Sequence, residues 1–295
     1  MQKVGLVMAT PSVKDDGTRI AKGQKTASDF PVPQPLSKHG PAHIISMVNQ
    51  KGGVGKTTST INLGAALASY GRKVLLVDFD PQGALSVGLG IPVYQLEKTL
   101  RHVLVGEQIP ARDVLVKTKV EGLDLLPSNI ELSAAELELV SEVGREQVLK
   151  SALSPLINEY DFIIIDCQPS LGLLTVNALA ASEGCIVPLE TEYFALRGLA
   201  LLTQTIDKIK GRINPNLQIL GILPTMYDPR TVHGREVLER VEDAFGDKVF
   251  ETVIARTVKF PETTAAGSPI TEYAPSSPAA KAYKRLAREL IHKIK

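Results

Sequence analysis

The sequence predicts an α/β fold, with a mostly parallel twisted sheet of about seven or eight strands and helices on both faces. Short apolar runs recur along the chain, and segments with apolar residues at helical spacing separate them. These runs are apolar throughout, which is typical of parallel strands that are buried on both faces.

The elements follow one another in a regular alternation. Strands are expected at 43–49, 73–80, 122–129, 160–170, 184–190 and 217–225, with 248–254 as a weaker candidate. A helix is expected to follow the first strand and to end at Gly71, a favourable residue at a helix C-terminus. Further helices are expected near 133–159, 173–182, 195–213 and 231–245. No internal repeat is visible.

Composition narrows the class of protein. The chain has 295 residues, of which 44% are hydrophobic and 22% charged, as in a globular protein with a full core. The net charge of +1 means that any surface for nucleic acid must be local. No apolar run is long enough to span a bilayer, and the N-terminus lacks the apolar core of a signal peptide. Cys167 and Cys185 lie in apolar segments, so we expect buried, reduced thiols in a cytoplasmic protein.

The first 41 residues differ in composition from the rest. They are rich in Pro, Ser, Gly, Lys and Asp and show no sustained periodicity. We therefore expect a disordered N-terminal tail over residues 1–41, either a dispensable extension or a partner-binding arm. Residues 42–295 are expected to form a single domain.

A phosphate-binding loop is predicted by "VNQKGGVGKTT", residues 48–58, between an expected strand and an expected helix. Gly52, Gly53 and Gly55 allow the backbone to curl so that its N–H groups point at phosphate oxygens. We expect Lys56 to reach the β- and γ-phosphates and the Thr57 hydroxyl to bind Mg²⁺.

One position of this loop is unusual. The common pattern has a glycine five positions before Gly55, where this chain has Gln50. Lys51 follows directly, so the loop carries two lysines.

Acidic residues follow two of the expected strands. Asp166 ends the strand in "DFIIIDCQPS", where an aspartate holds the metal in this type of site, although an isolated aspartate there also serves as a cap. Asp78 and Asp80 flank Phe79, so on a strand they point the same way, at the edge where ligands of parallel sheets bind. They suit metal solvation and positioning of a water molecule, with two solvated turn carboxylates as the alternative.

Several motifs together identify a family. "NQKGGVGKTT", "VLLVDFDPQG", "LLPSN", "DFIIIDCQPSLG" and "EYFALRGLALL", in this order, resemble the ParA/Soj partition ATPases. These are P-loop NTPases of the deviant Walker A group, which also includes the MinD proteins. The resemblance covers roughly residues 43–295.

The resemblance implies a role for each lysine. Lys56 is the ordinary phosphate lysine, whereas Lys51 is the signature lysine that crosses a dimer interface to the partner's nucleotide. It also implies that Asp80 positions the hydrolytic water, that Asp78 supports the water shell of the metal and that Thr58 contacts the α-phosphate. The resemblance thus implies three sets of site residues. The catalytic residues are Lys51, Lys56 and Asp80, and the metal-binding residues are Thr57, Asp78 and Asp166. The ATP-binding residues are Lys51, Gly52, Gly53, Val54, Gly55, Lys56, Thr57, Thr58, Ala255 and Thr257.

Recognition of the adenine base departs from the family pattern. The family tends to carry a Pro-Arg-Asn segment there, and this chain has Ala255-Arg256-Thr257. Contacts from the backbone of Ala255 to the adenine base remain available, because they do not depend on the side chains that differ. Residues 226–228 are further candidates for contact with the base.

Three related classes share such a loop. A MinD-like membrane ATPase, the main alternative, needs a C-terminal amphipathic helix with bulky apolar residues, whereas the apolar stripe of residues 279–294 looks core-facing. A nitrogenase-reductase-like protein needs cysteines placed for a shared cluster, and Cys167 and Cys185 are not so placed. A dethiobiotin- or cobyrinate-type ligase needs a small-molecule pocket, for which the sequence shows no motif.

Basic residues near the C-terminus predict a DNA-binding surface, with a solvated helix face as the alternative. Residues 281–295 contain six lysines and arginines and one acid, Glu289. The resemblance favours non-specific double-stranded DNA as the ligand, contacted through its phosphates. The predicted contacts are Arg256, Lys259, Lys284 and Arg285.

These expectations combine into one function. The resemblance implies a cytoplasmic, nucleoid-associated ATPase that binds ATP and Mg²⁺, forms an ATP-dependent homodimer and binds DNA. Its weak hydrolysis is expected to be stimulated by a ParB-type centromere-binding protein, and no membrane partner is expected.

Overall fold

A computed structural model describes residues 12–14, 16–20, 29–106, 108–192, 195–228 and 230–294. Its main sheet has seven strands in the order β5-β6-β4-β7-β3-β8-β9. The bounds are β3 (His43–Met47), β4 (Val74–Phe79), β5 (Val116–Lys117), β6 (Leu123–Leu126), β7 (Phe162–Cys167), β8 (Gly184–Glu190) and β9 (Gln218–Thr225). All neighbouring strands are parallel except β5 and β6. The prediction of a mostly parallel sheet is confirmed.

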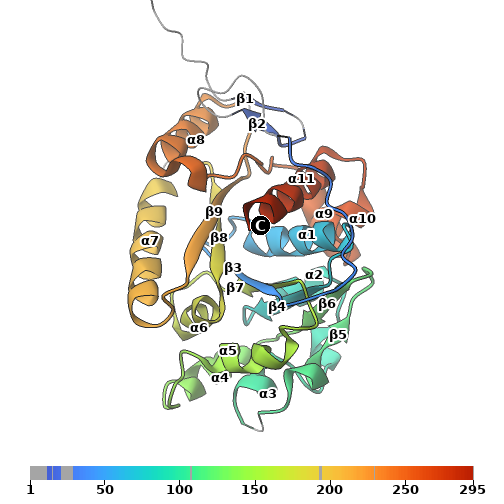
Figure 1. Cartoon of the computed structure of the whole chain (residues 1–295), viewed down its shortest axis with the longest axis vertical. Coiled ribbons are helices and arrows are strands. Elements are labelled where there is room, and N and C mark those ends of the chain that lie inside the picture. Colours follow the sequence, from blue (N-terminus) through green and yellow to red (C-terminus); the bar gives the residue numbers. More distant parts are fainter. Residues whose placement is uncertain are drawn as a thin grey trace, which may run out of the picture.

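One face of the sheet is covered by two helices from the first third of the chain and by the C-terminal helices (Figure 1). Here α1 (Lys56–Ala68) lies between the sheet and α11 (Pro278–Lys293), with α2 (Ala84–Gly88), α9 (Lys259–Ala266) and α10 (Ile270–Tyr273) nearby. Tyr283, Leu286 and Leu290 of α11 are at most 1% exposed and pack in the core on this face. The core-facing stripe predicted for α11 is therefore confirmed.

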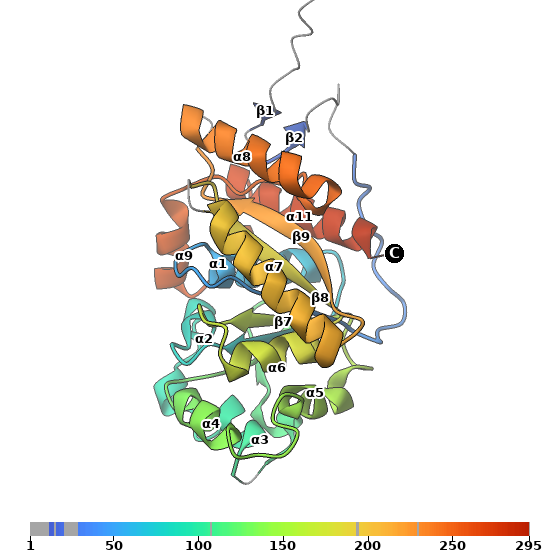
Figure 2. The same ribbon diagram turned by 90° about the vertical axis from the view of Figure 1, so that its left-hand side faces the viewer.

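The opposite face carries the helices from the middle of the chain. They are α3 (Leu100–Leu104), α4 (Leu132–Leu139), α5 (Val148–Leu153), α6 (Leu173–Ala181), α7 (Ala195–Arg212) and α8 (Val232–Phe245). Figure 2 shows α7 crossing β8 and β9. Short 3-10 turns are η1 (Val93–Gln95), η2 (Ala111–Val114), η3 (Ser154–Leu156) and η4 (Gly246–Lys248). Cys167 and Cys185 are buried free thiols, as predicted.

Two predicted elements differ from the structure. The expected helix 133–159 is divided into α4, α5 and η3, and the break contains Gly144 with φ of +71°. The weaker strand candidate 248–254 is not a strand of the sheet. It makes only single bridges, from Val249 to Ile222 and from Thr252 to Thr18. Residues 248–254 therefore lie between β9 and the N-terminal segment, and not between two strands of the sheet.

The described parts of residues 1–41 pack against the rest of the protein. β1 (Ser12–Val13) and β2 (Arg19–Ile20) form a small antiparallel pair. Arg19 is only 2% exposed and Phe30 only 6%. The prediction of disorder is wrong for residues 12–14, 16–20 and 29–41, because buried side chains tie them down. Residues 1–11 and 21–28 lie outside the described residues.

Among the described residues, no helix is both long enough and apolar enough to cross a bilayer.

Candidate nucleotide-binding site

The phosphate loop connects β3 to α1 at the C-terminal edge of the parallel strands. Gly53 and Gly55 have φ of +75° and +87°, a conformation that side chains with a Cβ rarely adopt. Gly55 precedes α1, and no side chain caps that helix terminus. The first N–H groups of α1 are thus available to an anion at its positive end.

The two lysines of the loop lie in different surroundings. Lys56 is 7% exposed, and its Nζ donates to the carbonyl oxygen of Lys51 at 3.2 Å. Burial lowers the pKa of Lys56, and the charge of Asp166 opposes this effect. Lys56 therefore folds back over its own loop.

Asp166 has the environment of a cation ligand. It is fully buried at the end of β7, and burial raises its pKa to about 7. Its Oδ1 accepts a hydrogen bond from Thr60 at 3.3 Å, and the Thr57 hydroxyl also lowers its pKa. Within the described chain its Oδ2 accepts no hydrogen bond although it is buried. A buried carboxylate oxygen without a donor is costly, so these residues fit Mg²⁺.

Asp78 and Asp80 separate in the structure. Asp78 lies beside Asp166 in the register of β4 and β7, but its Oδ2 accepts hydrogen bonds from Ser86 N at 2.8 Å and Ser86 Oγ at 2.6 Å. It thereby anchors α2, and burial raises its pKa to about 8. Asp80 lies beyond the end of β4, where its Oδ1 accepts from the N–H of Gln82 at 2.9 Å. The two carboxylates therefore have different hydrogen-bond partners, which their expected common direction on a strand did not predict.

A cavity of about 400 Å³ opens beside the loop. It contains the predicted residues Thr58, Met226, Ala255 and Thr257, together with Arg256. Sequence reasoning missed other lining residues, whose apolar or hydroxyl side chains carry no motif: Ser59, Thr225, Ile254, Phe260, Pro261, Thr264 and Tyr283. The mostly apolar lining and this size suit the nucleoside part of a nucleotide.

Residues 226–228 contribute to this region in different ways. Met226 has φ of +52°, which is unusual for a residue with a long side chain. Tyr227 is buried, and Asp228 pairs with Arg230 at 2.8 Å. Of these three residues, only Met226 lines the cavity.

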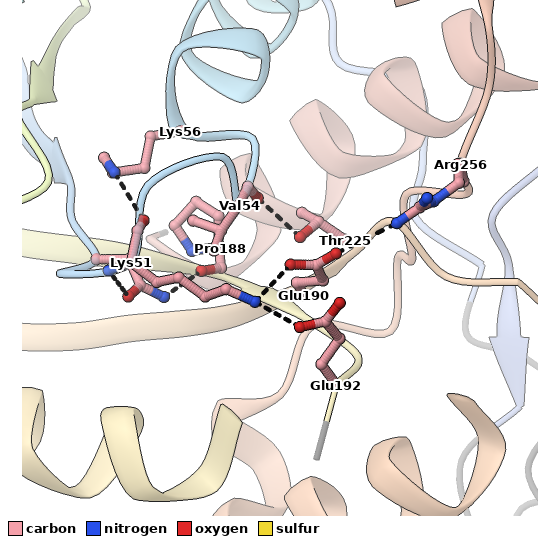
Figure 3. Close-up of polar contacts among 9 residues, drawn as sticks. Lys51, Val54, Lys56, Pro188, Glu190, Glu192, Thr225 and Arg256 are labelled. Carbon is pink, nitrogen blue, oxygen red and sulfur yellow. Dashed lines mark hydrogen bonds and ion pairs between the residues drawn. The ribbon is translucent and has the colours of Figure 1, made fainter. Parts of the chain in front are cut away.

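Lys51 points away from its own phosphate loop and is paired with two acids (Figure 3). Its Nζ lies 2.8 Å from Glu190 Oε2 and 2.6 Å from Glu192 Oε2. Hydrogen bonds to these acids raise the pKa of Lys51. The other oxygen of Glu190 lies 3.3 Å from Arg256 Nη2, so one carboxylate joins the two cations. Sequence reasoning missed Glu190 and Glu192, which follow each other closely at the end of β8.

The predicted DNA contacts are not equivalent. Arg256 has a side chain that is 66% exposed, Lys259 begins α9, and Lys284 is partly exposed on α11. Arg285 is 6% exposed, with its guanidinium 4.8 Å from the Phe30 ring centre and 3.3 Å from Glu251 Oε2. The predicted contact of Arg285 with DNA therefore requires the groups that cover it to move away.

Known proteins resemble this chain over most of its length. A family model described as an AAA domain matches residues 42–219. An uncharacterized protein of Mycobacterium tuberculosis is 61% identical over 280 residues, which are 95% of this chain and 88% of that protein. The sporulation initiation inhibitor protein Soj of Bacillus subtilis is 48% identical over 247 residues, which are 84% of this chain and 97% of Soj. This chain belongs to the ParA/Soj family.

A solved structure supports the fold of this ParA/Soj member. It is the cobyrinic acid a,c-diamide synthase of Mycobacterium smegmatis with bound ADP and magnesium, at 41% identity and a TM-score of 0.76. The match covers 85% of this chain and 94% of that one. The sequence-based assignment to the ParA/Soj family is confirmed, as is the P-loop α/β fold.

Proposed function

We propose that residues 42–295 form the ATPase domain of a DNA partition protein. It binds Mg-ATP, closes into a sandwich dimer, binds DNA without sequence preference and is released when a ParB-type partner stimulates hydrolysis. One observation carries the proposal: Lys56 lies in its own loop, whereas Lys51, with a side chain 52% exposed, points outward. An outward lysine beside a nucleotide loop suits contact with the phosphates of a second subunit.

Each residue at the loop has a distinct task in this proposal. The backbone of residues 52–55 and the Lys56 ammonium bind the phosphates, and Thr57 and Asp166 hold the metal. Mg²⁺ supplies charge neutralisation at the phosphates when bound. Asp80 orients the attacking water, while Asp78 fixes α2 behind it through Ser86.

The base is proposed to enter the cavity next to the loop. Ala255 and Thr257 line that cavity and offer backbone groups, and Thr58 lies toward the α-phosphate. Arg256 is at the same opening and also exposed, so it is available to either the nucleotide or DNA. Lys259 and Lys284 complete the proposed DNA contacts, which go to phosphates.

Two other functions are less well supported. A MinD-like membrane ATPase needs an apolar helix face for lipid, but the apolar side chains of α11 pack in the core. Cobyrinic acid diamidation is the activity named for the Mycobacterium smegmatis protein. That activity needs space for a corrinoid beside the phosphates, whereas the cavity of about 400 Å³ is nearer to nucleoside size.

Sedimentation with ADP, ATP and a non-hydrolysable analogue tests the proposal. We expect the wild type to dimerise with the analogue alone, Lys51→Ala to bind nucleotide as a monomer, and Lys56→Ala to lose nucleotide binding. A Lys51→Ala protein that dimerises normally contradicts the role across the interface. Adding random-sequence DNA, anionic vesicles or cobyrinic acid with glutamine to the wild type then separates the three functions.

A further inference from the structure

A stripe of basic residues runs along α11. Lys281, Arg285, Arg288 and His292 follow one another at spacings of three or four residues, and Lys284 is three after Lys281, so the five share one face of the helix. Lys281 and His292 are exposed, Lys284 and Arg288 are partly exposed, and Arg285 is buried beneath the N-terminal segment. The molecule therefore shows only part of this basic stripe to solvent.

Phe30 is the residue that covers the stripe. It is 6% exposed, and the Arg285 guanidinium lies 4.8 Å from its ring centre. Its carbonyl oxygen accepts a hydrogen bond from Arg288 Nη1 at 3.1 Å. Its ring centre is 5.7 Å from that of His292. Three residues of the basic stripe thus contact one residue of the N-terminal segment.

The covering segment, residues 16–20 and 29–35, is here called the strap. Arg19 anchors its first part, since this buried side chain pairs with Glu242 of α8 and donates to the carbonyl oxygen of Phe250 at 3.2 Å. Gly17 lies against α11: a Cβ at this position would be 2.8 Å from the Cβ of Ala282 in α11 and 2.5 Å from the carbonyl oxygen of Val253. With φ of +79° as well, Gly17 is needed for this close approach.

The second part of the strap is held at the end of α1. The carbonyl oxygen of Gln34 accepts a hydrogen bond from Arg72 Nη1 at 2.7 Å. Pro35 lies so close to Gly71 that a Cβ on this glycine would be 2.8 Å from the proline ring. Figure 1 shows this stretch passing α11 and α1 before it enters β3.

Relatives differ in this extension. The match to Soj takes in 97% of that protein but 84% of this chain, which leaves Soj no room for a comparable extension. The match to the Mycobacterium tuberculosis protein takes in 95% of this chain and so includes most of the first 41 residues. The strap is therefore an addition to the family's domain that is shared with a near relative.

We propose that the strap competes with nucleic-acid phosphates for the basic stripe of α11, so that this chain limits its own affinity for DNA. The inference rests on the proposed DNA binding. An arginine uses the same N–H donors for a carbonyl oxygen as for a phosphate oxygen, and its planar face is occupied when it stacks on a ring. A docked strap therefore takes one N–H donor of Arg288 and covers the face of Arg285 that a phosphate would approach. Arg288 gains most from release, because Glu251 still neighbours Arg285.

The test uses the full chain with substitutions in the strap alone. Gly17→Val and Phe30→Ala are combined, since the first blocks docking and the second removes the ring under Arg285. Val32→Ala is the matched control, because Val32 lies in the same stretch and is 61% exposed. Binding to a random-sequence duplex is measured with ATP over a range of salt concentrations, and nucleotide binding reports that the domain remains folded.

We expect the double variant to bind DNA more tightly and with a steeper salt dependence. Each added phosphate contact changes the slope of log K against log salt by about 0.9, so two released arginines add about 1.8 per subunit. Adding Arg288→Gln to the double variant should remove at least half of this gain, whereas Arg288→Gln alone should leave the wild-type slope unchanged. Val32→Ala should behave as wild type.

Two results overturn the inference. One is an unchanged salt slope in the folded double variant, and the other is a reduced slope for Arg288→Gln in the wild-type background. A wild type that binds no DNA with ATP does not by itself refute the proposed function, because a docked strap has the same effect. Binding gained by the double variant in that case still supports the strap, and absence of binding in both proteins refutes both proposals.

Discussion

Removing the acids that pair with Lys51 should strengthen ATP-dependent dimerisation. If Lys51 binds the partner's phosphates, it must first leave Glu190 and Glu192, which lie 2.8 and 2.6 Å from its Nζ. Glu190→Gln with Glu192→Gln keeps the size of both side chains and removes their charge, which also ends the ion pair of Glu190 with Arg256. The monomer then loses an interaction that competes with the dimer.

The structure sets the size of this effect. The side chain of Glu192 is 54% exposed and that of Glu190 12%, but the Lys51 side chain that both share is 52% exposed. Solvent at Lys51 screens both ion pairs, so each is worth about 0.2–1 kcal/mol. Taking about 1 kcal/mol for both pairs of one subunit gives about 2 kcal/mol for a dimer with two such lysines. Since 1.4 kcal/mol corresponds to a tenfold change, the dimer dissociation constant should fall by about 30-fold.

Sedimentation velocity over a concentration series, with a non-hydrolysable ATP analogue and separately with ADP, measures this constant. Glu138→Gln is the matched control, because Glu138 also forms an exposed pair, with Arg101 at 2.9 Å, away from the loop. We expect the control to behave as wild type. A double variant that dimerises no more tightly with the analogue, or equally well with ADP, would refute the reasoning.

Three further predictions address hydrolysis, DNA and pH. Asp80→Ala should bind ATP and dimerise but release little phosphate, because the water loses its positioning group; phosphate release equal to wild type in the presence of the partner contradicts this. Arg256→Glu with Lys259→Glu should abolish DNA binding and leave dimerisation intact. The affinity of the wild type for DNA should fall by roughly 10³-fold over a fourfold salt increase if six or more phosphates are contacted. Titrations with a random-sequence duplex measure both effects, and DNA binding retained by the variant contradicts the first. The hydrogen bond to Glu183 raises the pKa of His43, so the pair stabilises the fold below a pH of about 6.5 and this contribution is lost as pH rises through the raised pKa. Thermal unfolding of Glu183→Gln should then differ from wild type at low pH and converge with it at high pH, and a constant difference would count against the pair.

The sequence predicted the fold well wherever one local signal was enough. Uninterrupted apolar runs marked β4 and β7, whose residues are all buried, and the glycine pattern marked the loop before α1. The position of Asp166 at the end of its strand also followed from the pattern alone. The resemblance supplied the family, which the relatives confirm.

Features that depend on distant parts of the chain were not predictable in this way. Phe30 looks isolated in a polar stretch, and only the folded structure brings α11 against it. Arg285 looked like a surface residue because its helix is basic, but its exposure is decided by that same contact. Glu190 and Glu192 carry no motif, and their importance arises from lying within reach of Lys51.

The borders of the main sheet restrict how copies of this protein can associate. An unpaired strand at a border invites another chain to add to the sheet, which leads to aggregation. At one border β5 has only two residues, and Lys117 there has a side chain that is 86% exposed. At the other, Phe250 N donates to Ile222 O and Ile254 N to Pro224 O, each at 2.9 Å, so β9 is already occupied by its own chain. Growth of the sheet by strand addition is therefore discouraged at both borders, so association of copies of this protein must use other surfaces than the sheet edges.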